Sequence, residues 1–168
     1  RWELAKARRG DLEDLQGFYE KVSGGLTLDA IDMTPDALEQ NTLTEEYAKA
    51  GFRREMHRMA IRKNGELKAV VVVNLMNIGM NFSELTNATK LFVVDGNGFS
   101  KRDFGLMMSM VAVKFGLERI PLLVYPLDYL AKAGIPHEKT YAFNVVSMHY
   151  WDNYMRYLRE FMKKAKIS

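Results

Sequence analysis

The fold is decided by residues 62–73, which read RKNGELKAVVVV. Asn64-Gly65 stands between two strand-like runs, and this dipeptide is the strongest short signal for a β-hairpin because both residues tolerate positive φ. The four consecutive valines that close the stretch show no alternation of polar and apolar residues. Such a β-branched run is typical of a strand that is buried on both faces. The stretch therefore predicts two antiparallel strands, 53–63 and 66–75, with the second at the centre of a sheet.

Helical periodicity flanks this hairpin on both sides. Apolar side chains recur at helical spacing over residues 12–22, behind Asp11 as a predicted N-cap. A second helical region is predicted over residues 34–51, since a capping threonine is followed there by a proline. Ser100 is predicted to cap a third amphipathic helix, with Asp103 placed to reach back to the cap. The remaining predicted elements are strands at 2–7, 89–95, 120–125 and 140–148, a short helix at 127–133 and a terminal amphipathic helix at 150–166.

Composition places the chain among single-domain globular proteins. Its 168 residues, 48% of them hydrophobic, suffice for one core over residues 1–168. The absence of cysteine rules out disulfides and thiolate metal sites and fits a reducing cytoplasm. No apolar run approaches the ~20 residues that span a bilayer, so no membrane is expected as a partner. A net charge of +3 without basic clusters is too weak to predict a nucleic-acid partner. Because the chain begins at Arg1 rather than Met, we expect a fragment of a longer protein.

The order of the predicted elements is strand, two helices, three strands, helix, strand, helix, strand and a terminal helix. Over nearly the whole chain this order resembles the GNAT superfamily of N-acetyltransferases. Residues 4–15, LAKARRGDLEDL, look like the family's first strand and helix, and residues 130–135, LAKAGI, look like the end of its fourth helix. The resemblance implies an α/β fold with a mixed, largely antiparallel central sheet flanked by helices, here with an extra C-terminal helix.

The resemblance also implies a cofactor loop before the third helix. In the family this loop follows a Gln/Arg-x-x-Gly-x-Gly/Ala pattern, and its backbone amides hold the pyrophosphate of acetyl-CoA. Residues 93–102 read VVDGNGFSKR here, with a different glycine spacing and with Asp95 and Phe99 where the family prefers apolar and small residues. The segment is either an ordinary turn, which we favour, or an anion-binding loop. In the second case the candidate cofactor-binding residues are Val94, Gly96, Gly98, Ser100, Lys101 and Arg102.

Two residues are candidates for acid–base chemistry. The family tends to have a tyrosine on its fourth helix that can protonate the leaving thiolate, and Tyr129 lies about one position from the usual spacing. The resemblance therefore implies a catalytic role for Tyr129, with core packing as the alternative. His57 lies on a predicted strand and is a candidate base. A partly buried, hydrogen-bonded histidine is the favoured interpretation of His57.

A glycine-containing connection is a candidate for substrate binding. It joins the first two predicted helices, where GNAT enzymes place substrate-facing loops. Two glycines followed by apolar residues and aspartates could shape a pocket for a cationic amine, or they form an ordinary packed connection. The candidate residues are Ser23, Gly24, Gly25 and Asp29.

Three arginines share one face of the predicted strand 53–63, since they recur at every fourth position. A solvated face is the default expectation for such a row. An anion-binding surface is the sharper alternative. The residues are Arg54, Arg58 and Arg62.

Two functions remain open on the sequence. The departures from the cofactor loop favour a degenerate GNAT-like sensory or interaction module, a signalling part of a larger bacterial protein, for which no cofactor is expected. Its partner would be a neighbouring domain of the parent protein or a second copy of the chain. The alternative is an acyl-CoA-dependent N-acyltransferase that acts on a small amine or a peptide and requires acetyl-CoA or another acyl-CoA. No metal ion is expected, since the three histidines lack metal-ligand spacing.

Overall fold

The computed structural model describes residues 1–31, 33–38, 42–76, 88–94, 99–119, 121–126 and 128–139, together with residues 156, 159 and 160. Within this part of the chain, five strands lie side by side in chain order. All neighbours pair antiparallel except the last two, which are parallel. The prediction of a mixed, largely antiparallel sheet is therefore confirmed. The strands are β1 (Trp2–Lys6), β2 (Arg54–Lys63), β3 (Glu66–Met76), β4 (Thr89–Val93) and β5 (Leu122–Tyr125).

The predicted hairpin joins β2 to β3. Asn64 has φ 53° and Gly65 has φ 87°, so both turn residues lie in the left-handed region that the sequence pattern requires. Across the turn, Lys63 pairs with Glu66. β3 is the central strand, and its four consecutive valines are between 0% and 2% exposed. The prediction of a central, fully buried strand is confirmed.

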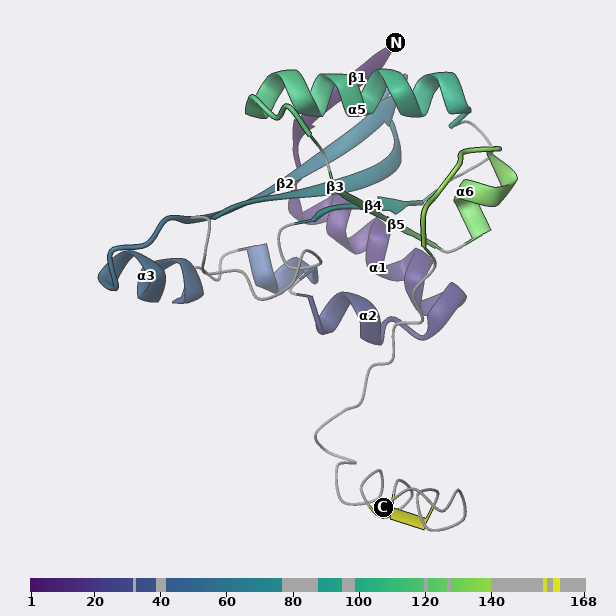
Figure 1. The fold of residues 1–168 in the computed structure, drawn as a ribbon. Coiled ribbons are helices and arrows are strands. Elements are labelled where there is room, and N and C mark those ends of the chain that lie inside the picture. Colours follow the sequence, from purple (N-terminus) through teal and green to yellow (C-terminus); the bar gives the residue numbers. More distant parts are fainter. Residues whose placement is uncertain are drawn as a thin grey trace.

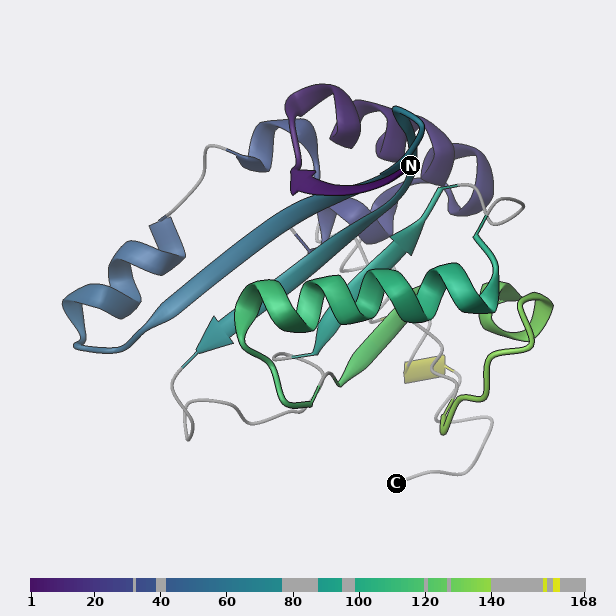
Figure 2. The ribbon, with the colours of Figure 1, turned by 90° about the horizontal axis from the view of Figure 1, so that it is seen from above.

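Helices cover both faces of the sheet (Figure 1). In Figure 2 the long helix α5 (Lys101–Phe115) lies across the near face of the sheet. The short helix α6 (Asp128–Lys132) lies close to the start of α5, beside the ends of β4 and β5. The far face is covered by the first helix and the short segments that follow it. These elements are α1 (Arg9–Ser23), α2 (Leu26–Asp29) and the 3₁₀ helix η1 (Pro35–Leu38) on the far face, α5 (Lys101–Phe115) and α6 (Asp128–Lys132) on the near face, and α3 (Thr42–Lys49) beside β2.

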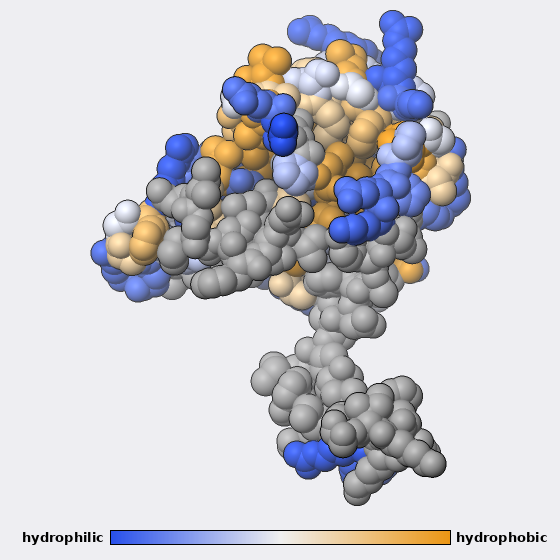
Figure 3. All heavy atoms as spheres, viewed as in Figure 1, coloured by the Kyte–Doolittle hydropathy of each residue, from blue (hydrophilic) through white to orange (hydrophobic). Residues whose placement is uncertain are grey.

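The alternation of side chains along β3 divides the core into two parts. Val71 and Val73 pack towards α5 and α6, whereas Val70 and Val72 pack towards α1 and α2. Each half of the core is thus one layer between the sheet and its helices. α5 forms an outer layer, and Figure 3 shows hydrophobic residues at the surface in this part of the molecule. Two large apolar residues of α5 are exposed: Leu106 at 50% and Val113 at 84%.

The first helix starts earlier than the sequence pattern indicates. Arg8 is the N-cap of α1, and Asp11 is the third helical residue, so the prediction of Asp11 as the cap is wrong. The carboxylate of Asp11 accepts a hydrogen bond of 2.7 Å from the backbone N–H of Arg8. Arg9 is polar and Gly10 has no side chain, so the first turn of α1 lacks the apolar spacing that indicates a helix in the sequence.

The arginines of β2 do not form a solvated face. All three, Arg54, Arg58 and Arg62, are half-buried. The guanidinium of Arg62 binds both carboxylate oxygens of Asp11, at 2.5 and 2.6 Å, and the two side chains are only 14% and 8% exposed. The default expectation of a solvated row is wrong, because α1 supplies the partner carboxylate of Arg62, and Arg54 donates a hydrogen bond of 3.1 Å to the hydroxyl of Thr44 on α3.

Some predictions lie outside the described residues. They are the strand at 140–148, the glycines Gly96 and Gly98, and most of the terminal helix at 150–166, of which residues 156, 159 and 160 are described and helical. The helical region predicted over residues 34–51 is divided between η1 and α3, with residues 39–41 outside the description. Among the described helices, none combines the length and the apolar character that a membrane crossing needs.

Candidate functional site

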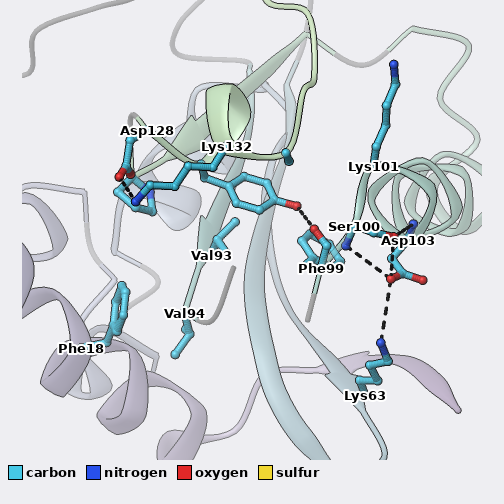
Figure 4. A pocket seen from close by; sticks show the side chains of 13 residues that line it. Phe18, Lys63, Val93, Val94, Phe99, Ser100, Lys101, Asp103, Asp128 and Lys132 are labelled. Atoms are coloured by element: carbon cyan, nitrogen blue, oxygen red, sulfur yellow. Dashed lines mark hydrogen bonds and ion pairs between the residues drawn. The ribbon is translucent and has the colours of Figure 1, made fainter. Parts of the chain in front are cut away.

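A cavity of about 670 Å³ lies at the C-terminal ends of the parallel strands β4 and β5, where α5 and α6 begin (Figure 4). In open sheets, ligands bind in the crevice outside the carboxyl ends of parallel strands. The described wall is half apolar and half polar. Its apolar members are Phe18, Val93, Val94, Phe99, Pro126, Tyr129 and Ala133, and its polar members are Lys63, Ser100, Lys101, Asp103, Asp128 and Lys132.

This wall brings together several residues that the sequence singles out separately. Val94, Ser100, Lys101 and Tyr129 all line the cavity, although β4, the start of α5 and α6 supply them. Arg102 follows Lys101 on α5 and is exposed, outside the described lining. Three of the six candidate cofactor-binding residues, Val94, Ser100 and Lys101, therefore share one cavity with the candidate acid Tyr129, whereas Gly96 and Gly98 lie outside the described residues.

At the start of α5 the cavity wall is formed by a capping box in which both reciprocal interactions are present. The Ser100 hydroxyl accepts a hydrogen bond of 3.2 Å from the backbone N–H of Asp103. In return, the Asp103 carboxylate accepts hydrogen bonds from the Ser100 hydroxyl at 2.9 Å and from its backbone N–H at 3.3 Å. The predicted cap and its returning aspartate are confirmed. Two donors at the helix start are thus satisfied by the chain itself.

Asp103 places a negative charge at this end of the cavity. Its carboxylate also accepts a hydrogen bond of 3.0 Å from the indole nitrogen of Trp2 and lies 3.9 Å from the ammonium of Lys63. Hydrogen bonding from the Ser100 hydroxyl is the main reason that the pKa of Asp103 lies below its ordinary value, and Trp2 and Lys63 add to the effect. The carboxylate is therefore ionised at neutral pH and occupies the positive end of the α5 dipole.

Tyr129 lies in the wall between α6 and α5. Its side chain is 4% exposed, and its hydroxyl donates a hydrogen bond of 2.6 Å to the backbone carbonyl of Phe99. The two rings stack with centroids 5.8 Å apart. Burial raises the pKa of Tyr129 well above its ordinary value, and the negative charge of Asp103 contributes. The phenol therefore keeps its proton at neutral pH.

The two remaining lysines of the wall differ in their surroundings. Lys132 forms an ion pair with Asp128 one turn earlier on α6. Lys101 is exposed at the start of α5 and forms no ion pair within the described part of the chain. In Figure 4 its side chain extends away from Asp103 and from the other labelled residues.

His57 lies elsewhere. Its ring packs against Phe115 with centroids 5.0 Å apart, and its Nε2 lies 3.0 Å from a carboxylate oxygen of Glu55. Phe115 is the last residue of α5, whereas the cavity is at the helix start. A helix of 15 residues is roughly 22 Å long, so the structure does not bring His57 to the cavity.

The proposed substrate-facing residues form the end of α1 and the short helix after it. Gly24 and Gly25 have φ 75° and 77°, and their backbone N–H groups donate to carbonyls of the last turn of α1. Asp29 is exposed at the end of α2. Gly24, Gly25 and Asp29 do not belong to the described lining, although Phe18 of α1 does, and the side chain of Ser23 lies outside the description.

Several wall residues escape sequence reasoning. Asp128 and Lys132 have the i, i+4 spacing of a helical ion pair, which is the one available signal. For Phe18 and Lys63 the sequence contains no signal of this kind, because only the packing of α1 and of the β2–β3 turn brings these side chains to the cavity. Within the described residues, no group of three or more His, Asp or Glu side chains could hold a metal ion.

The fold is GNAT-like over the described residues: as far as α6 the element order agrees with the one that the resemblance implies, and helices flank a mixed, largely antiparallel sheet. No protein-family model matches the chain, and no curated protein matches it.

Solved structures that align with the chain are acetyltransferases. An aminoglycoside N-acetyltransferase in complex with CoA is 12% identical with a TM-score of 0.43, over 87% of this chain and 95% of its own. A GCN5-related N-acetyltransferase from Ralstonia eutropha is 16% identical with a TM-score of 0.42, over 88% and 99%. A glucosamine-6-phosphate N-acetyltransferase from Arabidopsis thaliana is 12% identical with a TM-score of 0.41, over 88% and 99%. Likeness at this level carries no argument about activity.

Proposed function

We propose that this domain is a GNAT-like ligand-binding module, a sensory or interaction part of a larger protein, that does not transfer an acyl group. One observation carries the proposal: every described acidic or hydroxyl group of the cavity wall is already bound to another group of the protein. Asp103 and Ser100 bind each other, Asp128 binds Lys132, and Tyr129 binds the Phe99 carbonyl. Acyl transfer to an amine needs a base for the amine and an acid for the thiolate, each within reach of the reacting atoms.

The charge at the start of α5 supports the same proposal. A pyrophosphate bound there would lie against the ionised carboxylate of Asp103, which already occupies the positive end of the helix. The sequence adds Asp95 to the same segment. The Asp103 carboxylate at this position opposes the binding of a polyanion such as CoA.

The cavity still has the character of a small-molecule site. Its volume of about 670 Å³ lies within the usual range of roughly 300–1,000 Å³ for ligand pockets. Aromatic and aliphatic side chains form half of its described wall, with ion pairs at the start of α5 and on α6. The expected ligand has an apolar body and at most one charged group. The partner of such a module would be a neighbouring domain or a second copy of the chain.

One observation favours the second candidate, an acyl-CoA-dependent N-acyltransferase acting on a small amine or a peptide. Tyr129 and the start of α5 line the same cavity, which is where the resemblance puts the acid and the cofactor phosphates. Under this alternative, acetyl-CoA or another acyl-CoA is the cofactor. Its binding residues are then Val94, Gly96, Gly98, Ser100, Lys101 and Arg102.

Acetyl-CoA distinguishes the two candidates. For the binding module we expect no change in melting temperature with millimolar acetyl-CoA and no release of free thiol in the presence of amines or peptides. A bound cofactor at 100 times its Kd would instead stabilise the fold by about 2.7 kcal/mol. A melting shift of that size, together with thiol release, would make the domain an acyltransferase.

Ligand binding itself is tested with a panel of aromatic and aliphatic carboxylates and amines, followed by ligand-observed NMR. Ala133→Phe fills the cavity from the residue that directly follows α6, whereas Ala131→Phe on the exposed side of α6 is the matched control. We expect at least one compound to bind the wild-type protein and the Ala131→Phe variant but not the Ala133→Phe variant. If the panel contains no compound with this pattern, the binding function is rejected for these classes.

A further inference from the structure

We infer that Tyr129 is a positioning residue, whose hydroxyl ties α6 to the start of α5 and so sets the shape of the cavity wall. A proton donor to a leaving group would need a hydroxyl directed at that group. The hydroxyl of Tyr129 is directed instead at the backbone carbonyl of Phe99, 2.6 Å away. Both side chains are buried, at 4% and 1% exposure.

Phe99 is the point at which three elements of the fold meet. It directly precedes Ser100, the cap of α5. Its ring stacks on Tyr129 from α6 and packs against Trp2 from β1, with centroids 5.3 Å apart in the second contact. The hydroxyl of Tyr129 holds the backbone of this residue, and the two rings hold its side chain. A displacement of Phe99 would therefore move the cap of α5 and the indole of Trp2 together.

The surroundings of the phenol favour a permanent donor over a group that gives up its proton. A tyrosinate at this position would face the Phe99 carbonyl oxygen and lie near the ionised Asp103. Both interactions would be repulsive in a poorly solvated wall. A neutral hydroxyl that donates to a buried carbonyl is stable there, and removing it leaves that carbonyl without this donor.

For a ligand in the cavity, the consequence is a rigid aromatic wall formed by Phe99 and Tyr129. This consequence rests on the proposed function, whereas the bond between α6 and the start of α5 does not. The inference is therefore tested first on the protein without ligand.

Tyr129→Phe keeps the ring stack and removes only the hydroxyl. We expect amide hydrogen exchange at Asp103 and Phe104, both bonded to Ser100, to become roughly five- to tenfold faster, since one buried hydrogen bond is lost nearby. Exchange in the central strand β3 should change less. The matched control is Tyr125→Phe, a half-buried tyrosine stacked on Phe92 with centroids 4.7 Å apart. That control should leave the exchange of the first α5 turn unchanged.

Two further measurements keep the test independent of how well the variant folds. In the wild-type protein, the bond predicts a slowly exchanging, downfield NMR signal from the Tyr129 hydroxyl proton. In a Trp151→Phe background, where Trp2 is the remaining tryptophan, Tyr129→Phe should change the emission of Trp2 through Phe99.

Equal exchange at Asp103 and Phe104 in the Tyr129→Phe and Tyr125→Phe variants would overturn the positioning role. Thiol release from acetyl-CoA that Tyr129→Phe abolishes, with the exchange of the first α5 turn unchanged, would overturn it as well, because that pattern belongs to a proton donor. Failure of the proposed function has a different signature, namely a cavity that binds no compound while the exchange difference persists.

Discussion

The indole nitrogen of Trp2 donates a hydrogen bond of 3.0 Å to the carboxylate of Asp103, although 101 positions separate the two residues. The bond joins the first strand of the sheet to the first turn of α5. Lys63 completes the arrangement, with its ammonium 5.0 Å from the centre of the Trp2 ring and 3.9 Å from the carboxylate. Asp103 therefore completes the capping box of α5, forms an ion pair with Lys63 and lines the cavity.

Replacing Asp103 tests this combination. Asp103→Ala removes the returning half of the capping box and the acceptor of Trp2, so we expect a loss of about 1 kcal/mol in the free energy of unfolding. For a domain of this size that corresponds to roughly 2–4 °C in melting temperature. The control is Asp128→Ala, which removes an exposed i, i+4 ion pair of α6 and should change the melting temperature less than Asp103→Ala does. Equal effects of the two substitutions would mean that the contacts of Asp103 add nothing.

The difference in stability between the wild-type and Asp103→Ala proteins should depend on pH. The pKa of Asp103 in the folded protein lies below its ordinary value, mainly because the Ser100 hydroxyl donates to the carboxylate. Its stabilising contribution is therefore fully present above the unfolded pKa of about 3.9 and is lost as the pH falls through the lower folded pKa. Melting curves from pH 7 to pH 2 should show the wild-type and Asp103→Ala proteins converge in acid. A difference that grows towards acid would reverse the sign and contradict the assignment.

Two valines test the position of the core. Val71→Asp places an unpaired charge in the central strand, where the side chain is 0% exposed, and several kcal/mol of destabilisation should prevent folding. Val113→Asp introduces the same charge on α5 at a side chain that is 84% exposed and should shift the melting temperature by no more than about 2 °C. Circular dichroism and melting curves make the comparison. A folded Val71→Asp protein would be incompatible with this sheet.

The buried ion pair between Arg62 and Asp11 should matter more than an exposed pair. Arg62→Met leaves Asp11, 8% exposed, without its charged partner, so we expect a cost of about 3 kcal/mol in urea unfolding. Arg53→Met breaks a pair with Glu55 whose side chains are 63% and 40% exposed, and it should destabilise the domain much less than Arg62→Met does. If both variants unfold at the same urea concentration, α1 does not hold Asp11 against β2 as described.

Two glycines of the first helical region should respond in opposite directions to alanine. Gly17 lies within α1, and a methyl group added there would meet nothing within 4 Å, so Gly17→Ala should stabilise the domain by about 0.5–1 kcal/mol. Gly25 has φ 77°, and an added Cβ would lie 3.1 Å from the Glu20 side chain, so Gly25→Ala should destabilise by about 1 kcal/mol or more. Thermal melts of the two variants check the signs. A stabilising Gly25→Ala would show that the left-handed conformation at this position is not required.

The sequence by itself determined the elements whose signals are local. Asn64-Gly65 can form its turn without distant help, since left-handed backbone at both positions is a property of these residues. Ser100 and Asp103 stand three positions apart, which is all that a capping box requires. The run of valines in β3 has no polar face to expose, so it predicted its own place at the centre of the sheet.

Only the tertiary structure decided which partners these elements meet. The ion pair of Arg62 with Asp11 spans 51 positions, and the bond from Tyr129 to Phe99 spans 30. No periodicity encodes such distances, because they depend on how helices cross the sheet. For that reason the sequence pattern predicted a solvated row of arginines, whereas Arg62 in fact binds Asp11 of α1 and Arg54 binds Thr44 of α3. The pattern also left the role of Tyr129 open between catalysis and packing. The cavity exists for the same physical reason: β4, α5 and α6 end or begin at one edge, and their packing, rather than any local preference, leaves the space between them.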